Sequence, residues 1–231
     1  MEVYVGTSGW AYPWNEGGNF SWYIEHSGLN AVELNSSFYR FPFQSMIKSW
    51  AAKTGNLRWS VKVTRLVTHT YKFAGGAMAA WHDFRQLFTP LEGNIDFYLF
   101  QLPPSLTPES SATIEAFFQQ AALKERFALE PRNVKWFDDK WFKWASKLGL
   151  TWVSVDSPVL PRNILVTNSI VYVRMHGRTA WYSYKYTLEE LKNVAHEILN
   201  LKPRKAYVFF NNDEDMLVNS REMFDILRKA A

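Results

Sequence analysis

The stretch VYVRMHGR, residues 171–178, alternates apolar side chains with polar or charged ones. A β-strand places successive side chains on opposite faces, so Arg174 and His176 share one face while Val173 and Met175 share the other. A buried charge without a partner is costly, so a charged strand face needs opposite charges on neighbouring strands. The stretch therefore predicts a sheet in which several strands contribute to one charged face.

Strand-like runs recur along the chain and alternate with helical patterns. Eight runs are predicted to be strands: VYVG (3–6), AVEL (31–34), WSVKV (59–63), IDFYLFQ (95–101), FALE (127–130), WVSVD (152–156), IVYVRM (170–175) and AYVFF (206–210). Apolar residues with helical spacing lie between most of them, for example over 114–121, 141–148 and 188–198. Strands that alternate with helices are typical of parallel βαβ units.

Eight such units predict a compact (β/α)8 TIM-type barrel that forms a single domain over residues 1–231. A doubly wound open sheet is the alternative, but the glycine-rich phosphate turn that usually follows its first strand is missing. The segment 157–169 contains two prolines and no helical stripe, so we predict a loop in place of the sixth helix.

The composition excludes several classes of protein. The chain has no cysteine, which excludes disulfides, thiolate catalysis, zinc ribbons and iron–sulfur clusters. No run is long enough to span a membrane and the start lacks the features of a signal peptide, so we expect a cytoplasmic protein with no membrane partner. The net charge of +4 is spread along the chain, which is typical of a solvated surface.

Polar side chains at other strand ends repeat the pattern of residues 171–178. In a barrel, active sites lie at the C-terminal ends of the strands. The polar side chains that we expect on the inward face there are Glu33, Asn35, Lys62, Gln101, Glu130, Arg132, Asp156, Arg174 and His176. Because several of them are charged and come from different strands, they predict a functional site.

Five motifs carry a resemblance to a known family: VGTSGWAYPW (5–14), VELNSSFYRFP (32–42), FQLPPS (100–105), VYVRMHGR with the following AWYSY (180–184), and FFNND (209–213). In this order they resemble the domain-of-unknown-function 72 (YecE-like) family over nearly the whole chain. The resemblance implies a (β/α)8 barrel and a pocket, and it supplies no reaction. This chain departs from the family at 129–132, where Leu-Glu-Pro-Arg replaces the common glutamate–phenylalanine–arginine run.

Five side chains are predicted to carry the chemistry: Glu33, Lys62, Glu130, Asp156 and His176. Carboxylates and an imidazole transfer protons, although a turn or core role for His176 stays open. A lysine whose pKa is lowered by burial can form a Schiff base, whereas a lysine beside a carboxylate stays charged and binds anions. His69, in the loop after the third predicted strand, is a further acid–base candidate.

Eleven side chains are predicted to bind the substrate: Trp10, Asn35, Tyr39, Arg40, Gln101, Arg132, Arg174, Arg178, Trp181, Tyr182 and Asn212. The arginines are fork-shaped donors that suit carboxylate or phosphate groups. The aromatic rings after the first and seventh strands can stack on sugars or bases, or pack on one another as a lid.

Glu33, Glu130, Asp156 and His176 also suit a divalent metal, but no His-x-His or His-Glu-x-x-His spacing occurs. We favour carboxylates paired with lysine and arginine, so no metal ligand is assigned and no cofactor is required, while a divalent metal stays open. The first hypothesis is an enzyme, whether hydrolase, lyase or isomerase, that acts on a small anionic substrate such as a phosphorylated or carboxylated sugar or nucleotide. The alternatives are a nucleic-acid-processing protein, with or without a metal, and a non-catalytic binding barrel.

Overall fold

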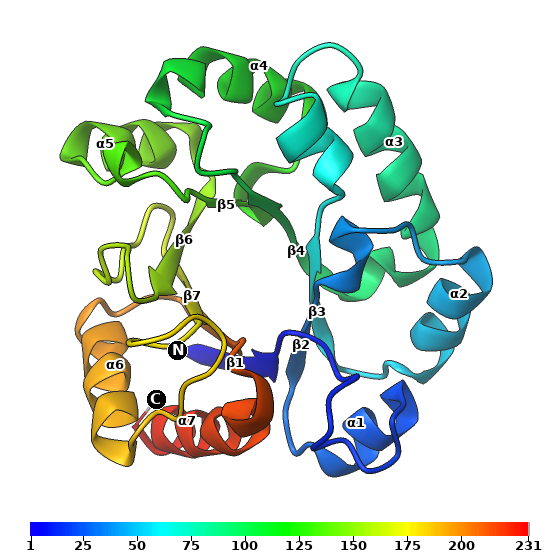
Figure 1. The fold of residues 1–231 in the computed structure, drawn as a ribbon, viewed down its shortest axis with the longest axis vertical. Helices are drawn as coiled ribbons and strands as arrows, with labels where there is room; N and C mark the ends of the chain where they lie inside the picture. The colour runs from blue at the N-terminus through cyan, green and yellow to red at the C-terminus, as the bar shows by residue number, and fades with distance from the viewer. Residues whose placement is uncertain (231) are drawn as a thin grey trace.

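The computed structural model describes residues 1–230, which form a closed barrel of parallel strands seen end-on in Figure 1. The strands are β1 (Glu2–Thr7), β2 (Ala31–Leu34), β3 (Arg58–Lys62), β4 (Ile95–Gln101), β5 (Phe127–Glu130), β6 (Thr151–Asp156), β7 (Ile170–Met175) and β8 (Lys205–Phe210). Strand β8 pairs with β1 from Lys205 opposite Glu2 to Phe210 opposite Thr7, which closes the sheet. This closure confirms the predicted (β/α)8 barrel and excludes the open sheet.

The helices surround the barrel on its outside (Figure 1). They are α1 (Phe20–His26), α2 (Gln44–Lys53), α3 (Ala77–Leu87), α4 (Ser111–Ala121), α5 (Asp139–Leu148), α6 (Leu188–Asn200) and α7 (Met216–Ala230). Helix α6 begins with a capping box, in which the Thr187 hydroxyl accepts from the Glu190 N–H and the Glu190 carboxylate accepts from the Thr187 N–H. None of the helices in residues 1–230 has the length and apolar character that crossing a membrane requires.

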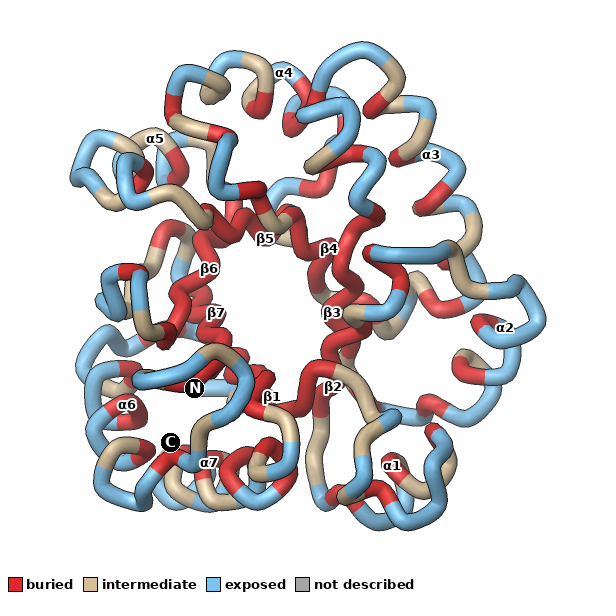
Figure 2. Tube along the Cα trace, viewed as in Figure 1, coloured by how far each residue is buried: buried red, intermediate tan, exposed pale blue. Residues whose placement is uncertain are grey.

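The apolar core has two layers, and Figure 2 shows that burial concentrates along the strands. Inside the barrel, residues at alternate strand positions form the lumen cluster of Ala31, Phe97, Leu99, Ala128, Val153, Ile170, Tyr172, Tyr207 and Phe209. The intervening positions pack under the helices, as Val171, Val173 and Met175 do against α6 and α7. The period of two predicted for residues 171–178 therefore separates the lumen from the outer core.

The loop between β6 and β7 covers its strand without a helix, as the prolines of residues 157–169 predict. In this loop and in β6, short polar side chains form hydrogen bonds with backbone N–H and carbonyl groups. The Thr167 hydroxyl donates to the Leu150 carbonyl at 2.6 Å and accepts from the Trp152 N–H at 3.1 Å. The Ser154 hydroxyl accepts from the Leu165 N–H at 3.0 Å. The loop is thus fixed against the outer face of β6 by short polar side chains.

Gly6→Ala is expected to destabilise the fold by about 1–3 kcal/mol or more, because β1 approaches β2 too closely for a side chain. A Cβ on Gly6 would lie 2.2 Å from the Ala31 carbonyl oxygen, and that oxygen belongs to the backbone. Gly93→Ala is the matched control, since a Cβ there meets nothing within 4 Å. Urea unfolding of both variants measures the difference, and equal stabilities would contradict the close approach.

Candidate active site

Arg174 lies at the centre of a buried ion network at the C-terminal end of the barrel. Its Nη2 donates to Glu33 Oε1 at 2.6 Å, and its Nη1 donates to Glu130 Oε2 at 2.5 Å. The Arg174 side chain is 1% exposed and both carboxylates are 0% exposed. Although burial opposes its charge, Glu130 and Glu33 raise the pKa of Arg174 above its ordinary value. The guanidinium therefore bridges carboxylates from β2 and β5, as the alternation of residues 171–178 predicted.

Glu33 has further partners that the sequence interpretation missed. The Ser8 hydroxyl donates to Oε1 at 2.8 Å and the Tyr172 hydroxyl donates to Oε2 at 2.6 Å. Tyr172 also exchanges a hydrogen bond with Ser60 at 2.6 Å. The Glu33 carboxylate thus accepts hydrogen bonds from Ser8, Tyr172 and Arg174. Neither Ser8 nor Tyr172 is among the predicted site residues, although Tyr172 shares the strand face of Arg174.

Glu130 is joined to His176 through Arg132. The Arg132 Nε–H donates to Glu130, and its Nη2 lies 3.1 Å from His176 Nε2. Burial raises the pKa of Glu130, but Arg132, Arg174 and Lys62 outweigh it and lower that pKa below its ordinary value. Glu130 is therefore an ionised carboxylate whose oxygens are both bound to guanidinium groups, which makes it a poor proton acceptor.

His176 is a buried neutral imidazole with both ring nitrogens engaged. Its Nδ1 lies 3.2 Å from the Asn211 amide, and Nε2 faces Arg132. Burial, with the charges of Arg174, Arg132 and Lys62, lowers the pKa of His176 well below its ordinary value. Its catalytic role stays a prediction, and its contacts show that it holds Arg132 in place.

Trp181 covers this part of the network. Its ring lies 4.7 Å from the Arg132 guanidinium and 5.3 Å from the His176 ring. Tyr182 packs edge-on against His176 at 5.5 Å, and its N–H donates to the His176 carbonyl at 2.8 Å. The loop after β7, yellow in Figure 1, thus brings both predicted aromatic residues over the network.

Lys62 differs from the other charged groups because its ammonium has no hydrogen bond or ion pair within residues 1–230. Its side chain lies at the end of β3, is 8% exposed, and places Nζ 4.3 Å from the centre of the Phe38 ring. Burial and the charges of Arg174 and Arg132 lower the pKa of Lys62 to about 7. Glu130 and Glu33 oppose that shift without cancelling it.

His69 packs against the same Phe38 ring, edge-on at 4.9 Å. It lies in a single π-helical turn, η2 (Leu66–Thr70), and its Nδ1 shares a hydrogen bond of 2.8 Å with the Thr68 hydroxyl. Burial and the positive charges of Lys62 and Arg65 lower the pKa of His69 to about 4. The imidazole is therefore neutral beside Lys62.

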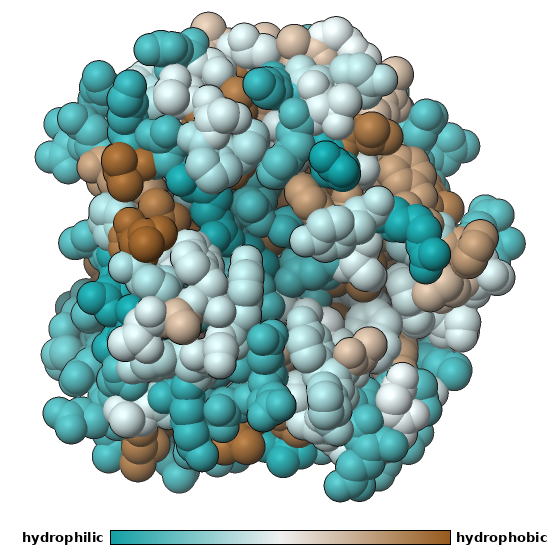
Figure 3. Space-filling model, in the orientation of Figure 1, coloured by the Kyte–Doolittle hydropathy of each residue, from teal (hydrophilic) through white to brown (hydrophobic). Residues whose placement is uncertain are grey.

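Three polar groups of this region keep unused hydrogen-bonding capacity within residues 1–230: Lys62 Nζ, Arg132 Nη1 and the Gln101 amide. Gln101 lies opposite Glu130 in the β4–β5 register. Asn35 is partly used, since its Oδ1 accepts from Arg174 at 3.3 Å. Seen down the barrel axis, hydrophilic surface gathers over the centre of the molecule (Figure 3).

The charges of the network are balanced without Lys62. The carboxylates of Glu33 and Glu130 balance the guanidinium groups of Arg132 and Arg174, so a proton on Lys62 is an unbalanced positive charge.

The prediction that Asp156 faces the lumen is wrong. Val153 and Tyr172 lie opposite each other in the β6–β7 register and both belong to the lumen cluster, so Asp156 points outward. Its carboxylate accepts from Arg178 Nη2 at 2.9 Å and from the Tyr186 hydroxyl at 3.1 Å. Arg178 is consequently also outside the lumen, where it joins the β6 end to the loop before α6.

Two predicted substrate ligands occupy structural positions instead. Trp10 packs between α1 and α2, with its ring 4.7 Å from Phe20 and 5.3 Å from Trp50. Asn212 points to the outside of the barrel, where its Nδ2 donates to the Tyr184 carbonyl at 2.7 Å. The neighbouring Asn211, which contacts His176, is the residue at the network.

Tyr39 and Arg40 are exposed on the loop after β2, and Tyr39 packs edge-on against Phe38 at 4.9 Å. Phe38 also contacts Lys62 and His69, so this loop borders the mouth of the barrel. Substrate binding by Tyr39 and Arg40 stays a prediction. Phe38 itself was missed, because an aromatic residue in a loop gives no sign that it will meet a lysine.

The side chains that suit a divalent metal do not surround one common position within residues 1–230. Within residues 1–230, no three His, Asp or Glu side chains are grouped as metal ligands. Arg174 lies between Glu33 and Glu130, and Asp156 is on the other side of the strand. The carboxylates are thus paired with arginines, whereas the pairing with Lys62 that the sequence interpretation also favoured does not form within residues 1–230.

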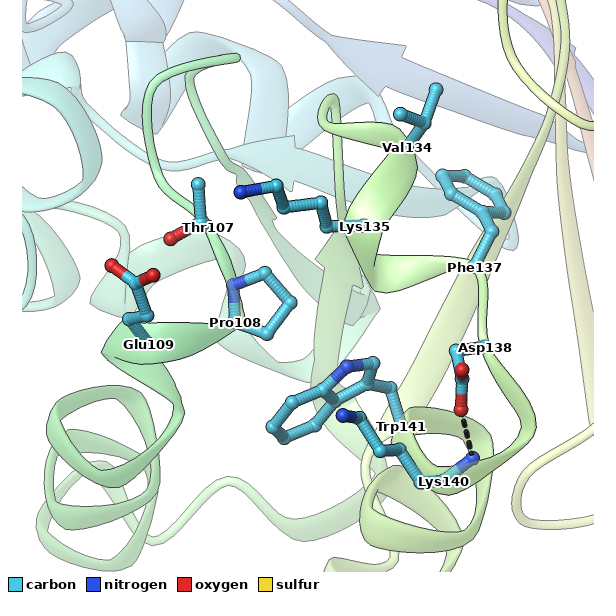
Figure 4. A pocket seen from close by; sticks show the side chains of 9 residues that line it. All are labelled: Thr107, Pro108, Glu109, Val134, Lys135, Phe137, Asp138, Lys140 and Trp141. Atoms are coloured by element: carbon cyan, nitrogen blue, oxygen red, sulfur yellow. Dashed lines mark hydrogen bonds between the residues drawn. The ribbon is translucent and has the colours of Figure 1, made fainter.

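A separate groove of about 610 Å³ opens between the loops that follow β4 and β5 (Figure 4). It is lined by Thr107, Pro108, Glu109, Val134, Lys135, Phe137, Asp138, Lys140 and Trp141. None of the network residues lines it. Lys140 Nζ lies 5.0 Å from the Trp141 ring centre, and the Asp138 carboxylate accepts from the Lys140 N–H. The groove lies at the same end of the barrel as the network, because both loops follow strand C-termini.

The sequence matches a family model described as "Protein of unknown function DUF72" over residues 4–230. The chain belongs to the DUF72 family. No curated protein matches its sequence. The fold is similar to that of a DUF72 family protein from Enterococcus faecalis V583, with 21% identity, a TM-score of 0.83, and 98% of this chain and 95% of that chain covered.

A DUF72 family protein from Thermotoga maritima MSB8 is similar at 24% identity and a TM-score of 0.81, covering 100% of this chain and 99% of that one. A D-psicose 3-epimerase from Clostridium cellulolyticum H10, solved with D-tagatose, is 12% identical with a TM-score of 0.63, and 99% of each chain is covered. These likenesses establish the TIM-type barrel of the DUF72 chain, which the resemblance in its motifs implied.

Proposed function

We propose that this DUF72 protein is an enzyme that acts on a small anionic substrate, with Lys62 as the group that transfers protons. The observation that supports the proposal is a buried lysine without a partner beside a saturated ion network. A proton-transfer group works best when its pKa lies near the working pH. Lys62 meets that condition, whereas Glu130 and His176 are held in one protonation state by their surroundings.

An anion fits the unused donors. Arg132 Nη1 and the Gln101 amide can donate to a carboxylate or phosphate oxygen, while the charge of protonated Lys62 attracts the anion. Trp181 and Tyr182 then form the wall above the substrate. A sugar or nucleotide fragment that carries a carboxylate or phosphate presents the acceptor oxygens that these donors suit.

Ribose 5-phosphate and pyruvate, tested separately, are expected to raise the melting temperature of the protein. A ligand at 100 times its dissociation constant stabilises by about 2.7 kcal/mol, which a thermal-shift assay detects. The shift is expected to shrink in Arg132→Gln and to remain in the matched control Arg162→Gln, an exposed arginine of the loop after β6. A shift produced only by short oligonucleotides would overturn the proposal in favour of nucleic-acid processing.

A further inference from the structure

Lys62 combines features that a proton-transfer role alone does not require. Its amine is fixed over Phe38 rather than in an ion pair, although two carboxylates lie in the same network. Those carboxylates are bound to Arg174 and Arg132 and cannot hold the lysine as an ammonium. The neutral amine of Lys62 therefore has a nitrogen lone pair that is available at the C-terminal end of the barrel.

We propose that Lys62 is a nucleophile that forms a Schiff base with an aldehyde or ketone bearing a carboxylate or phosphate group. This inference rests on the proposed function, because the anionic group of the carbonyl compound occupies the site beside Arg132 and Gln101. The carbonyl carbon is then presented to Nζ, because Lys62 and Gln101 end the neighbouring strands β3 and β4, and Lys62 lies opposite the lumen residue Leu99. The substrate class is thus narrowed from small anions to anionic carbonyl compounds.

The covalent step balances with one proton taken up from solvent and no other reactant. The Nζ lone pair attacks the carbonyl carbon, the π electrons of the carbonyl move to oxygen, and a proton passes from nitrogen to oxygen to give a carbinolamine. Protonation of the hydroxyl and loss of water then leave a carbon–nitrogen double bond with a positive charge. One water is released per adduct, and nothing is oxidised or reduced.

Two carboxylates partly offset the charge of that adduct. The iminium nitrogen occupies the position of the ammonium, where Glu130 and Glu33 oppose the effects of burial, Arg174 and Arg132. His69 lies against the same Phe38 ring, and its Nε2 has no hydrogen bond within residues 1–230. Because His69 is neutral, its role in this scheme is to relay a proton from solvent to the departing hydroxyl, not to store one.

Selectivity for Lys62 over the exposed lysines follows from its environment. Near neutral pH about half of the Lys62 side chains are neutral amines, whereas an ordinary lysine is neutral in a fraction roughly a thousandfold smaller. Only the neutral amine attacks a carbonyl group. A carbonyl probe at low concentration is consequently expected to label Lys62 first.

The test is borohydride trapping of the full chain near neutral pH with pyruvate, glyoxylate or glycolaldehyde phosphate, each supplied alone. Peptide mass mapping is expected to find one reduced adduct per chain, located on Lys62 and saturating with probe concentration. Lys62→Arg and Lys62→Met lose that adduct, and the control Lys48→Arg, which changes an exposed lysine of α2, keeps it. His69→Asn is expected to slow trapping about tenfold or more without abolishing it, because a proton-transfer group typically contributes at least that much.

Adducts spread over exposed lysines, or trapping that survives in Lys62→Arg, would overturn the assignment. The failure of this step is distinguishable from that of the proposed function. A probe that raises the melting temperature through Arg132 yet leaves no adduct contradicts only the Schiff base. If none of the three probes shifts the melting temperature or leaves an adduct, both proposals fall.

Discussion

Arg174→Met is expected to lower the free energy of unfolding by about 3–5 kcal/mol, because it leaves the buried Glu33 carboxylate without a cation and removes one of the two guanidinium groups that bind Glu130. Glu33 and Glu130 are both 0% exposed, and the guanidinium that joins them is 1% exposed. Water cannot replace the lost donors at such depth. Urea unfolding of the variant against the parent protein measures the loss, and a variant that does not fold agrees with the upper end of the range.

Two comparisons separate the effect of buried charge from that of lost packing. In the double variant Arg174→Met, Glu33→Gln, the uncompensated carboxylate is gone and Glu130 keeps Arg132 as its partner, so much of the lost stability is expected to return. Arg204→Met is the exposed control: the Arg204–Glu125 pair is 48% and 52% exposed, and its loss costs about 1 kcal/mol or less. Equal losses in Arg174→Met and Arg204→Met would show that the network is not held by buried charge.

The sequence predicted the network through the period of two in its strands. Residues 171–178 alternate strictly, and the observed alternation places Arg174 and His176 inside and Val173 outside. The barrel itself followed from eight alternating units, and the helix-free crossover followed from the prolines of 157–169. These features are local consequences of chain geometry, so a single sequence carries them.

Asp156 shows where that reasoning stops. A period of two says which residues share a face, but not which face is inward, and β6 has apolar residues on both sides. Trp152 packs outside against Phe142 of α5, while the smaller Val153 fits in the lumen. The inward face is therefore decided by volume and by neighbouring strands, neither of which is visible in the strand alone.

The aromatic residues show a second limit. Trp10 and Trp181 both follow strand ends, yet Trp10 packs under α1 and α2 while Trp181 covers Arg132. Both positions bury a large apolar surface, so the hydrophobic effect does not distinguish them in a sequence. Only the path of each loop determines whether its tryptophan packs under the helices or covers the network. The same holds for Asn211 and Asn212, because adjacent residues at a strand end point to opposite sides.

Lys62→Met is expected to stabilise the protein below pH 7 by on the order of 4 kcal/mol, and this gain is expected to disappear as the pH rises toward 10.5. The sign follows from proton binding. The pKa of Lys62 is lowered to about 7 in the folded protein from an ordinary value of 10.5. Between these values the unfolded chain keeps the proton that the folded chain has released, so the stability of the parent protein rises with pH.

Below pH 7 both states are protonated, and the folded protein bears the full cost of burying an ammonium without a partner. Methionine keeps the apolar stem over Phe38 and removes the charge, so the difference between variant and parent isolates this one titration. His69, Glu130 and His176 are coupled to Lys62, but their pKa values are lowered below their ordinary values, so they do not titrate between pH 7 and 10.5. Groups remote from Lys62 titrate equally in both proteins and cancel. Urea unfolding at a series of pH values measures the difference in the free energy of unfolding between variant and parent. Lys48→Met, at an exposed position of α2, is the control, and its difference from the parent should not change with pH. Parallel curves for Lys62→Met and the parent would mean that Lys62 keeps an ordinary proton affinity, and the amine could then serve neither as the proton-transfer group nor as the nucleophile near neutral pH.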